Sequence, residues 1–341
     1  MHPMTNRRVL LARRPRGMPV AEDFTLVHEP VPQAGPGRLL LRNLYLSLDP
    51  YMRGRMNDDA HGYAAPYALG APPGGATVAR VVQAGIAGYA QDELVVVPDG
   101  GWQDYVVSDG AGLRRLPAET ARPSLALGIL GMTGFTAWWG LTAIGEARAG
   151  ETLVVSAAAG AVGSTAGQIG RLLGCRVVGI AGGPEKCRLM VEEFGFDACI
   201  DYRAPDFPAR LAVAAPGGVD IYFENVGGAV RDAVWPLLNT GARVPVCGLV
   251  ANYNGAACTA GARIDQMLMS LIVKRIRMQG FMNADHIDAF DSFEAQMRGW
   301  LADGRLRAAE SMVRGLGQAP HAFIGLFRGD NTGKLVLQLE D

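Results

Sequence analysis

Apolar and polar positions alternate regularly through the middle of the chain, from residue 151 to residue 281. Short apolar runs are separated by longer segments in which apolar residues recur at helical spacing. Each run predicts a buried strand and each intervening segment a helix, which together make one strand–helix unit of a parallel sheet. Repetition of this unit predicts an α/β domain with a doubly wound, six-stranded parallel sheet. The predicted strands are 152–156, 176–181, 198–201, 219–224, 242–247 and 275–281.

The sequence before residue 127 has a different pattern, in which short β-like runs are separated by glycine and proline turns. This pattern predicts a barrel-like β domain over residues 1–126. After the parallel sheet the chain is expected to form a helix, a strand, a short helix and a last strand, and a lone strand needs a sheet to join. Residues from about 297 to 341 are therefore expected to return to the first domain, and residues 127–296 to form the second. The β-like runs are 38–43, 77–82, 93–97 and 105–107, and the last strand is 334–339.

Length and composition fit two domains that bind a small molecule. The chain has 341 residues, more than a single hydrophobic core normally spans, and 49% of them are apolar. Its formal net charge is -1, so there is no electrostatic argument for nucleic acid or an anionic membrane as a partner. Residues 1–8 lack the apolar core of a signal peptide and no long apolar stretch occurs, which predicts a cytoplasmic protein.

The cysteines and histidines give no metal-binding pattern. Five cysteines lie in the middle of the chain without a C-x-x-C pair, and five histidines are scattered without metal-ligand spacing. Each cysteine is expected to be a small apolar residue, the alternative being a ligand or a nucleophile. The sequence therefore predicts neither a disulfide framework nor a catalytic metal. The cysteines are Cys175, Cys187, Cys199, Cys247 and Cys258.

A glycine-containing turn follows the first predicted strand of the parallel sheet. Residues 156–163 read Ser-Ala-Ala-Ala-Gly-Ala-Val-Gly and connect the strand to a helix that begins near Ser164. Small residues in such a turn let backbone N–H groups approach a pyrophosphate, and the N-terminus of the helix adds about half a positive charge. The turn is therefore a candidate dinucleotide site, related to the G-x-G-x-x-G pattern. The alternative is a turn whose glycines serve only close packing.

The end of the second predicted strand indicates which dinucleotide is bound. Sites for NAD carry an acid there that holds the ribose 2′-hydroxyl, whereas residues 177–183 of this chain end in two glycines. This leaves room for a 2′-phosphate, and Lys186 in the first turn of the next helix has the charge to bind it. NADP(H) is therefore predicted as the cofactor. The alternative for Lys186 is a solvent-exposed lysine beside Glu185.

Several motifs together resemble those of one enzyme family, and they extend over nearly the whole chain. They are Leu44–Met56, which is the most specific, Gly101–Tyr105, Gly131–Ala137, Ala157–Gly163, Tyr222–Gly228 and Gly329–Lys334. The sequence is similar to the zinc-free medium-chain dehydrogenases/reductases, in particular to the branch of leukotriene B4 dehydrogenase, prostaglandin reductase, plant alkenal double-bond reductases and bacterial curcumin reductase. The resemblance implies a GroES-like β-barrel catalytic domain and a Rossmann domain that bind NADPH between them.

The resemblance also implies which residues contact the cofactor. The turn after the first strand would hold the pyrophosphate, and Lys186 and Tyr202 would surround the 2′-phosphate. Asn225 and Asn331 would lie at the nicotinamide half, although both stand near glycines and have an alternative interpretation as turn residues. The implied cofactor-binding residues are Gly160, Ala161, Val162, Gly163, Gly183, Lys186, Tyr202, Asn225, Cys247, Gly248, Leu249, Val250, Tyr253, Phe281, Met282, Asn283 and Asn331.

Two segments depart from the family pattern and leave the identity of the substrate open. The usual proline-rich lid is replaced by the smaller residues of Asn254–Gly261, and the segment Val97–Gly100 is shifted from the usual strand end. Neither departure affects the predicted use of the cofactor. The residues expected to line a moderately large apolar substrate pocket are Met52, Tyr63, Tyr67 and Met282.

The chemistry that we infer from the resemblance is reduction of the C=C bond of an α,β-unsaturated ketone or aldehyde. NADPH would transfer a hydride to the β-carbon, and water would protonate the resulting enolate at the α-carbon. Tyr253, on the insertion after the fifth predicted strand, is the candidate donor to the enolate oxygen, and Tyr51 is the candidate for positioning the substrate. The alternatives are that Tyr253 only covers the nicotinamide and that Tyr51 belongs to the core of the β domain.

Two other functions are compatible with the sequence, namely an NADPH quinone reductase and a non-catalytic NADPH-binding protein of the same fold. A small-molecule substrate is expected for either enzyme, and no nucleic-acid or membrane partner is expected. The sixth predicted strand, Arg275–Phe281, would lie at an exposed sheet edge. In the family that the sequence resembles, such edges pair across a two-fold axis, which protects them, so the resemblance implies a homodimer.

Overall fold

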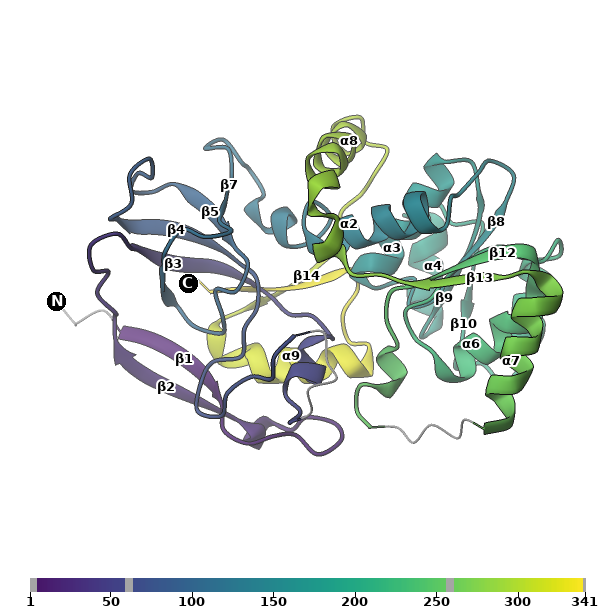
Figure 1. The fold of residues 1–341 in the computed structure, drawn as a ribbon, viewed down its shortest axis with the longest axis horizontal. Helices are drawn as coiled ribbons and strands as arrows, with labels where there is room; N and C mark the ends of the chain where they lie inside the picture. The colour runs from purple at the N-terminus through teal and green to yellow at the C-terminus, as the bar shows by residue number, and fades with distance from the viewer. Residues whose placement is uncertain (1–4, 59–63, 256–260, 340–341) are drawn as a thin grey trace. The chain divides into compact units, whose positions relative to one another are not determined.

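The computed structural model describes residues 5–58, 64–255 and 261–339. The chain divides into two compact units, one that ends at Gly128 and resumes at Glu310, and one from Ile129 to Ala309 (Figure 1). The boundaries predicted from the sequence are 126 and about 297. Over the described residues, no helix combines the length and the apolar character needed to cross a lipid bilayer.

Within the described residues, the second unit is built on a six-stranded parallel sheet with the order β10-β9-β8-β11-β12-β13 (Figure 1). The order reverses between β8 and β11, so the carboxyl ends of these two strands form the switch point of a doubly wound sheet. All six strands lie where the apolar runs predict them, and the predicted α/β fold of this unit is confirmed. The strands are β8 Thr152–Val155, β9 Arg176–Ala181, β10 Ala198–Asp201, β11 Val219–Phe223, β12 Leu238–Val246 and β13 Arg277–Gly280.

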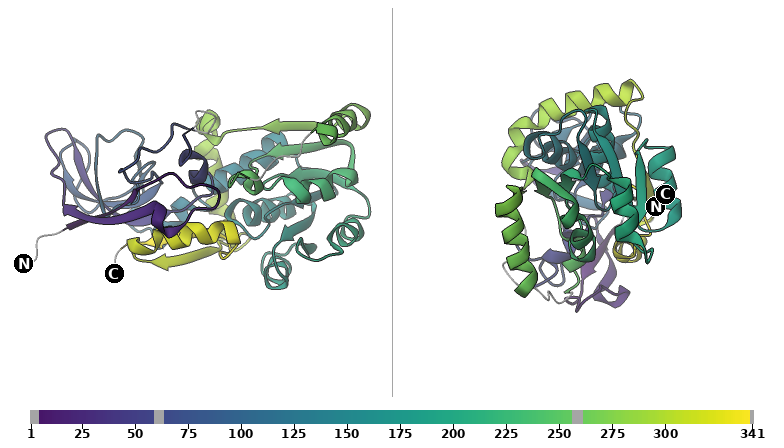
Figure 2. Two further views of the ribbon diagram at one scale, coloured as in Figure 1. Left: turned by 90° about the horizontal axis from the view of Figure 1, so that it is seen from below. Right: turned by 90° about the vertical axis from the view of Figure 1, so that its right-hand side faces the viewer.

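Helices cover both faces of this sheet (Figure 2). On one face glycines bring the helices close to the strands, since a Cβ on Gly170 would collide with Leu153 and one on Gly140 would lie 2.8 Å from Phe223. On the other face, helices α5, α6 and α7 enclose a core that contains Val154 and Tyr222. The helices are α2 Met132–Trp139, the π-helical turn Gly140–Ile144, α3 Ala161–Leu172, α4 Pro184–Glu192, α5 Phe207–Ala214, α6 Gly228–Val234, α7 Gly261–Lys274 and α8 Phe290–Ala302, with 3₁₀ turns at Trp235–Leu237, Val250–Asn252 and Asn283–Ala289.

The first unit is a β structure that the two ends of the chain build together. In the part of the chain that the structure describes, its larger sheet has seven strands in the order β14-β15-β3-β4-β5-β7, with β6 also paired to β3, and β1 and β2 form a separate antiparallel pair. Strand β15 pairs with β3, so the C-terminal segment joins the sheet of the N-terminal segment. The strands are β1 Thr5–Leu11, β2 Phe24–Pro30, β3 Leu39–Ser47, β4 Thr77–Ala84, β5 Leu94–Val97, β6 Tyr105–Ser108, β7 Arg114–Arg115, β14 Glu310–Arg314 and β15 Lys334–Gln338.

The helices of the first unit are few and short. Trp102 lies in the core of this unit. Its ring stacks on Phe24 at a centroid distance of 5.4 Å and makes an edge contact with Phe323 at 5.5 Å. The predicted β-like runs correspond to β3, β4, β5 and β6, whereas β1, β2 and β7 have no counterpart among them. The helices are α1 Met52–Arg55 and α9 Ala319–Arg328, with 3₁₀ turns at Ala21–Asp23, Pro123–Leu127 and Leu316–Gln318.

Candidate functional site

The turn after β8 holds helix α3 against the loop that precedes it. Ala157 has a left-handed backbone with a φ of 49°, and its carbonyl oxygen accepts a hydrogen bond from the N–H of Gly160 at 2.9 Å. A Cβ on Gly163 would collide with the same carbonyl oxygen. Glycine is therefore required at position 163 for the helix to approach the loop this closely.

The N-terminus of α3 lies at the carboxyl end of β8. The N-cap residue is Gly160, which has no side chain that could cap this helix end. The first N–H groups of a helix lack intrahelical acceptors, and the helix dipole places partial positive charge there. The backbone of Gly160–Gly163 consequently suits a pyrophosphate, which is the ligand that the sequence predicts for it.

The end of β9 is shaped by two glycines and by a carboxylate from β10. Gly183 has a φ of 95° and its N–H donates to Asp201 Oδ1 at 2.9 Å. The same oxygen accepts the N–H of Arg203 at 3.0 Å. These hydrogen bonds, the one from Gly183 first, lower the pKa of the Asp201 carboxyl. Asp201 therefore stays ionised at neutral pH and fixes the backbone turn that precedes α4.

Arg203 is a cationic residue at this turn that the sequence reasoning missed. A Cβ on Gly182 would lie 3.1 Å from Arg203 Nε and 3.1 Å from Tyr202 Cε1, so both side chains lie over this glycine. The guanidinium carbon is 5.8 Å from the centroid of the Tyr202 ring, which is 46% exposed. Lys186 lies in the first turn of α4, next to this turn. The one signal in the sequence was the position of Arg203 directly after Tyr202.

A buried hydrogen-bond network joins the carboxyl ends of β8 and β11 at the switch point. The amide of Asn225 donates to the Ser156 carbonyl oxygen at 2.7 Å, and its backbone N–H donates to Ser156 Oγ at 2.8 Å. Glu224 Oε1 accepts the N–H groups of Val226 and Gly227 at 2.7 and 3.0 Å. This network sets the orientation of the Asn225 side chain and the path of the Gly227 turn.

The loop after β12 is tied to the same network. The N–H groups of Cys247 and Gly248 donate to the Glu224 carbonyl oxygen at 2.9 and 3.2 Å, and the N–H of Val250 donates to the Asn225 carbonyl oxygen at 3.1 Å. A Cβ on Gly248 would lie 3.1 Å from the Tyr253 hydroxyl. The phenol of Tyr253 therefore lies over Gly248, at the carboxyl edge of the sheet.

Other predicted residues of the second unit border this loop or follow β13. Leu249 lies against the turn after β11, since a Cβ on Gly227 would be 3.2 Å from its side chain. Phe281 packs close to Gly140, whose Cβ would lie 2.8 Å from its ring. The Asn283 amide donates to Thr136 Oγ1 at 3.3 Å, and the Met282 side chain is exposed.

Tyr51 lies in the first unit, immediately before α1, and packs against the core of that unit. Burial, and secondarily the nearby Asp49 carboxylate, raises the pKa of its phenol well above the usual value, so the group stays a neutral hydrogen-bond donor. Tyr67 is also buried, and its hydroxyl donates to the Gly74 carbonyl oxygen at 3.0 Å. Arg55 lies over the Tyr67 ring at 4.1 Å from the centroid.

The expectation that Met52 lines a substrate pocket is wrong. Its side chain has no exposed surface and belongs to the core cluster of the first unit. Its thioether methyl fills the space beside Gly75, where a Cβ would lie 2.9 Å away. A large apolar side chain in the first turn after a β-strand has the same sequence signature in a core as in a pocket. Tyr63, which shared this expectation, lies outside the described residues, as do residues 256–260 of the lid.

Asn331 also lies in the first unit, in the loop before β15, and its amide donates to the Gly333 carbonyl oxygen at 2.8 Å. The next strand begins with the buried Lys334, whose Nζ lies 2.6 Å from the Asp49 carboxylate and donates to the Leu48 carbonyl oxygen at 2.9 Å. Removing one partner of such a buried pair leaves an uncompensated charge. The pair therefore fixes the loop of Asn331 to the turn that carries Tyr51.

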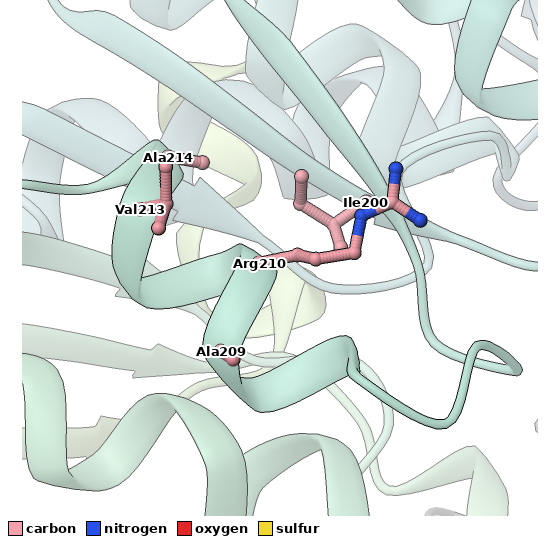
Figure 3. Close-up of a pocket in the computed structure, with 5 residues that line it drawn as sticks. All are labelled: Ile200, Ala209, Arg210, Val213 and Ala214. Atoms are coloured by element: carbon pink, nitrogen blue, oxygen red, sulfur yellow. The ribbon is translucent and has the colours of Figure 1, made fainter.

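The predicted site residues of the second unit follow strands β8, β9, β10, β11, β12 and β13. The carboxyl ends of these parallel strands lie along one edge of the sheet (Figure 1). A separate hollow of about 350 Å³ lies between α5 and β10 and contains none of them (Figure 3). The Arg210 side chain extends alongside Ile200 there, and the other lining residues are Ala209, Val213 and Ala214. Across the described chain, no three His, Cys, Asp or Glu side chains are grouped so that they could hold a metal ion.

Comparisons with known proteins show to which family this chain belongs. Residues 7–116 match the family described as the N-terminal domain of oxidoreductase, and residues 161–299 match the one described as zinc-binding dehydrogenase. The chain is 49% identical over 336 residues to the NADPH-dependent curcumin reductase of Escherichia coli (strain K12), which covers 98% of this chain and 97% of that protein. This chain belongs to the medium-chain dehydrogenase/reductase superfamily. Its first unit is the GroES-like domain of that superfamily and its second unit the Rossmann domain, as the sequence predicts.

Two further members of the superfamily bear on the cofactor. The 2-alkenal reductase (NADP(+)-dependent) of Nicotiana tabacum is 37% identical over 342 residues, with 98% of each chain covered. The crystal structure of CurA in complex with NADPH from Vibrio vulnificus has a TM-score of 0.94 and 49% sequence identity, and covers 98% of this chain and 99% of that chain. The open helix end, the acid-free end of β9 and Arg203 fit the same dinucleotide.

Proposed function

We propose that this chain catalyses the NADPH-dependent reduction of the C=C bond of α,β-unsaturated ketones and aldehydes. The observation that carries the proposal is its similarity, over nearly the full length, to a curcumin reductase and a 2-alkenal reductase that use NADP. The end of β9 supports the choice of cofactor, because an acid at this place would select NAD. Here Gly182 leaves the backbone open and Arg203 lies over it.

When bound, NADPH supplies the hydride that is added to the β-carbon of the substrate. The chain contributes binding and orientation, since the N–H groups of the Gly160–Gly163 backbone suit a pyrophosphate. The Ser156–Glu224 network fixes the orientation of Asn225, which is proposed to contact the nicotinamide half. Correct alignment of the two reacting carbons lowers the entropic part of the barrier. Water protonates the α-carbon of the enolate that results.

Lys186, Tyr202 and Arg203 form the proposed site of the 2′-phosphate. A guanidinium binds phosphate oxygens in a fixed fork, whereas an ammonium acts as a point charge. Arg203 is supported by its place over Gly182, and Lys186 by its position in the first turn of α4. The residues proposed to surround the nicotinamide half are Asn225, Cys247–Val250, Tyr253, Phe281–Asn283 and Asn331.

Tyr253 is the proposed hydrogen-bond donor to the enolate oxygen. Its hydroxyl lies beside the backbone of Gly248 at the carboxyl edge of the Rossmann sheet, where ligands of this fold bind. Tyr51, which lies immediately before α1 and keeps a neutral phenol, is proposed to position the substrate. Both roles use a neutral phenol as a donor, so neither requires an ionised side chain.

The Rossmann unit is proposed to form a homodimer through its β13 edge. All four residues of β13 are exposed, and helix α7 beside it carries an exposed apolar stripe, whereas its Leu271 packs against the core under the sheet. Pairing two copies would cover both the free strand edge and the apolar stripe. The exposed apolar residues of the stripe and strand are Ile264, Leu268, Met269, Ile272, Val273 and Met278.

Oxidation of NADPH by purified protein tests the proposed function. With a panel of enones, enals and quinones, we expect turnover with the enones and enals, and a much lower rate when NADH replaces NADPH. The reduced product should carry the label at the β-carbon when the hydride of NADPH is deuterated. Turnover of quinones alone would identify a quinone reductase, and tight NADPH binding without turnover of any acceptor would identify a binding protein.

A further inference from the structure

Two thiols meet between helix α4 and strand β10. Helix α4 buries Cys187 together with Met190 on the side that faces the sheet. Cys199 pairs with Gly179 of β9, and a Cβ on that glycine would lie 3.1 Å from Cys199 Sγ, so the glycine makes room for the thiol. The next residue, Ile200, points to the opposite face, into the core formed with α5. The Cys199 thiol thus faces α4, where it shares a hydrogen bond with Cys187.

The two thiols are chemically different. Their shared hydrogen bond is the main reason that the pKa of Cys187 is lowered while the pKa of Cys199 is raised. Cys187 also lies in the first turn of α4, where the helix dipole favours a thiolate. Burial raises the pKa of Cys175 to about 11 and that of Cys247 to about 12. Cys187, which is 8% exposed, is therefore the member of this pair in which the shared hydrogen bond and the helix end favour the thiolate.

We propose that Cys187 and Cys199 are a redox pair that hydrogen peroxide converts to an intrachain disulfide, and that this disulfide weakens the binding of NADPH. The Cys187 thiolate attacks the peroxide, so that an S–O bond forms, the O–O bond breaks and the first water leaves. The Cys199 thiol then attacks the Cys187 sulfur, so that the S–S bond forms, the S–O bond breaks and a second water leaves. Two electrons pass from the thiols to the peroxide, and both thiol protons end in water.

The effect on NADPH follows from the position of the pair. Lys186 immediately precedes Cys187, and Tyr202 and Arg203 follow Cys199 at the end of β10. A disulfide brings two sulfur atoms to about 2.05 Å, much closer than a hydrogen-bonded thiol pair. Forming it therefore shifts the first turn of α4 relative to β10. This consequence rests on the proposed function, because it takes Lys186, Tyr202 and Arg203 as the residues that bind the 2′-phosphate.

Mass spectrometry of the full-length protein tests the disulfide without reference to activity. After peroxide treatment and alkylation of the remaining thiols, we expect a linked pair of peptides that contain Cys187 and Cys199, and its loss on reduction with dithiothreitol. Cys187→Ser and Cys199→Ser should each abolish the link, while Cys175→Ser should keep it. Alkylation of both cysteines after the treatment, a link from either one to Cys258, or oxidation of Cys187 to the sulfinic acid alone would overturn the proposal.

Binding titrations test the proposed effect of the disulfide on the affinity for NADPH. We expect oxidised protein to bind NADPH about tenfold more weakly than reduced protein, equivalent to the loss of one hydrogen bond to a charged group. Affinity for NADH should be unchanged, and so should the affinity of peroxide-treated Cys187→Ser for NADPH. Equal affinity of the oxidised and reduced forms for NADPH contradicts the coupling, as does reduced protein that binds no NADPH. The latter result also contradicts the proposed function, whereas the disulfide itself is judged from the peptide masses alone.

Discussion

At the scale of the residue, Arg203 lies in the proposed 2′-phosphate site because a glycine leaves room for its side chain. Gly182 has no Cβ, and the guanidinium of Arg203 occupies the space over its backbone. The neighbouring Asp201 carboxylate is held by the N–H groups of Gly183 and Arg203, so it orders the turn. The proposed preference for NADP thus depends on residues after two different strands, of which Lys186 was predicted and Arg203 was not.

Replacement of Arg203 tests this preference. We expect Arg203→Gln to raise the KM for NADPH about tenfold, because a hydrogen bond between charged groups contributes about one factor of ten in affinity. The KM for NADH should stay the same, since NADH has no 2′-phosphate. Steady-state kinetics with both cofactors measure the two values. Arg188→Gln, which removes an exposed arginine that pairs with Glu192 on α4, is the matched control and should leave both values unchanged.

The phenol of Tyr253 is a second test at this scale. If it donates to the enolate oxygen, Tyr253→Phe should lower kcat/KM for an enone by about 10²-fold to 10³-fold, the usual effect of removing one such donor. The dissociation constant for NADPH should change little, because the ring remains to cover the nicotinamide. Tyr89→Phe, at a half-buried tyrosine that stacks on Arg115 in the first unit, is the control. An unchanged kcat/KM would remove Tyr253 from the mechanism.

At the scale of the element, the strand β8, the turn after it and helix α3 act as one structural unit. The periodicity of the sequence predicts both elements, and the glycine spacing predicts the turn between them. The left-handed Ala157 and the contact of its carbonyl with α3 could not be predicted, because both follow from the distance at which the helix packs. The glycine at 163 is therefore required by the packing of the unit as well as by the proposed pyrophosphate.

Alanine at position 163 tests how tightly this unit packs. We expect Gly163→Ala to destabilise the protein by about 1–3 kcal/mol, the usual cost of forcing extra volume into a packed position. Affinity for NADPH should fall as well, since the helix N-terminus moves away from the turn. Thermal or urea unfolding and NADPH titration measure the two effects. In Gly299→Ala, at an exposed position of helix α8, a Cβ meets open space, so this variant should be slightly more stable than the wild type.

Two of the three strands that the sequence missed, β2 and β7, were missed for the same reason. Strand β2 has one buried residue among its seven, and β7 is a two-residue strand with no buried side chain. Such strands have no apolar alternation because neither face is covered, so their hydrogen-bond partners decide that they exist. The central strands β8, β9 and β11 of the Rossmann sheet are predictable because nearly all of their residues are buried, with helices on both faces.

At the scale of the whole molecule, the proposed dimer accounts for the exposed apolar residues of α7. We expect the wild type to elute from gel filtration at the mass of a dimer and Ile272→Asp to elute at the mass of a monomer, because a carboxylate would be buried in the interface. Ile272 is 71% exposed. Val213→Asp is the matched control, since Val213 on α5 is 79% exposed but lies away from the proposed interface. A monomeric wild type, or a dimer that Ile272→Asp leaves intact, would contradict the proposal.

By itself, the sequence determined the Rossmann sheet, the turn after β8 and the choice of NADP, because these depend on periodicity and on the local chemistry of short segments. The tertiary structure decided which distant residues meet. Lys334 pairs with Asp49 across 285 positions of sequence, Cys199 meets Cys187, and Met52 fills the core instead of a pocket. Such contacts depend on the packing of elements in space, and no local pattern records which of a residue's possible neighbours the fold brings to it.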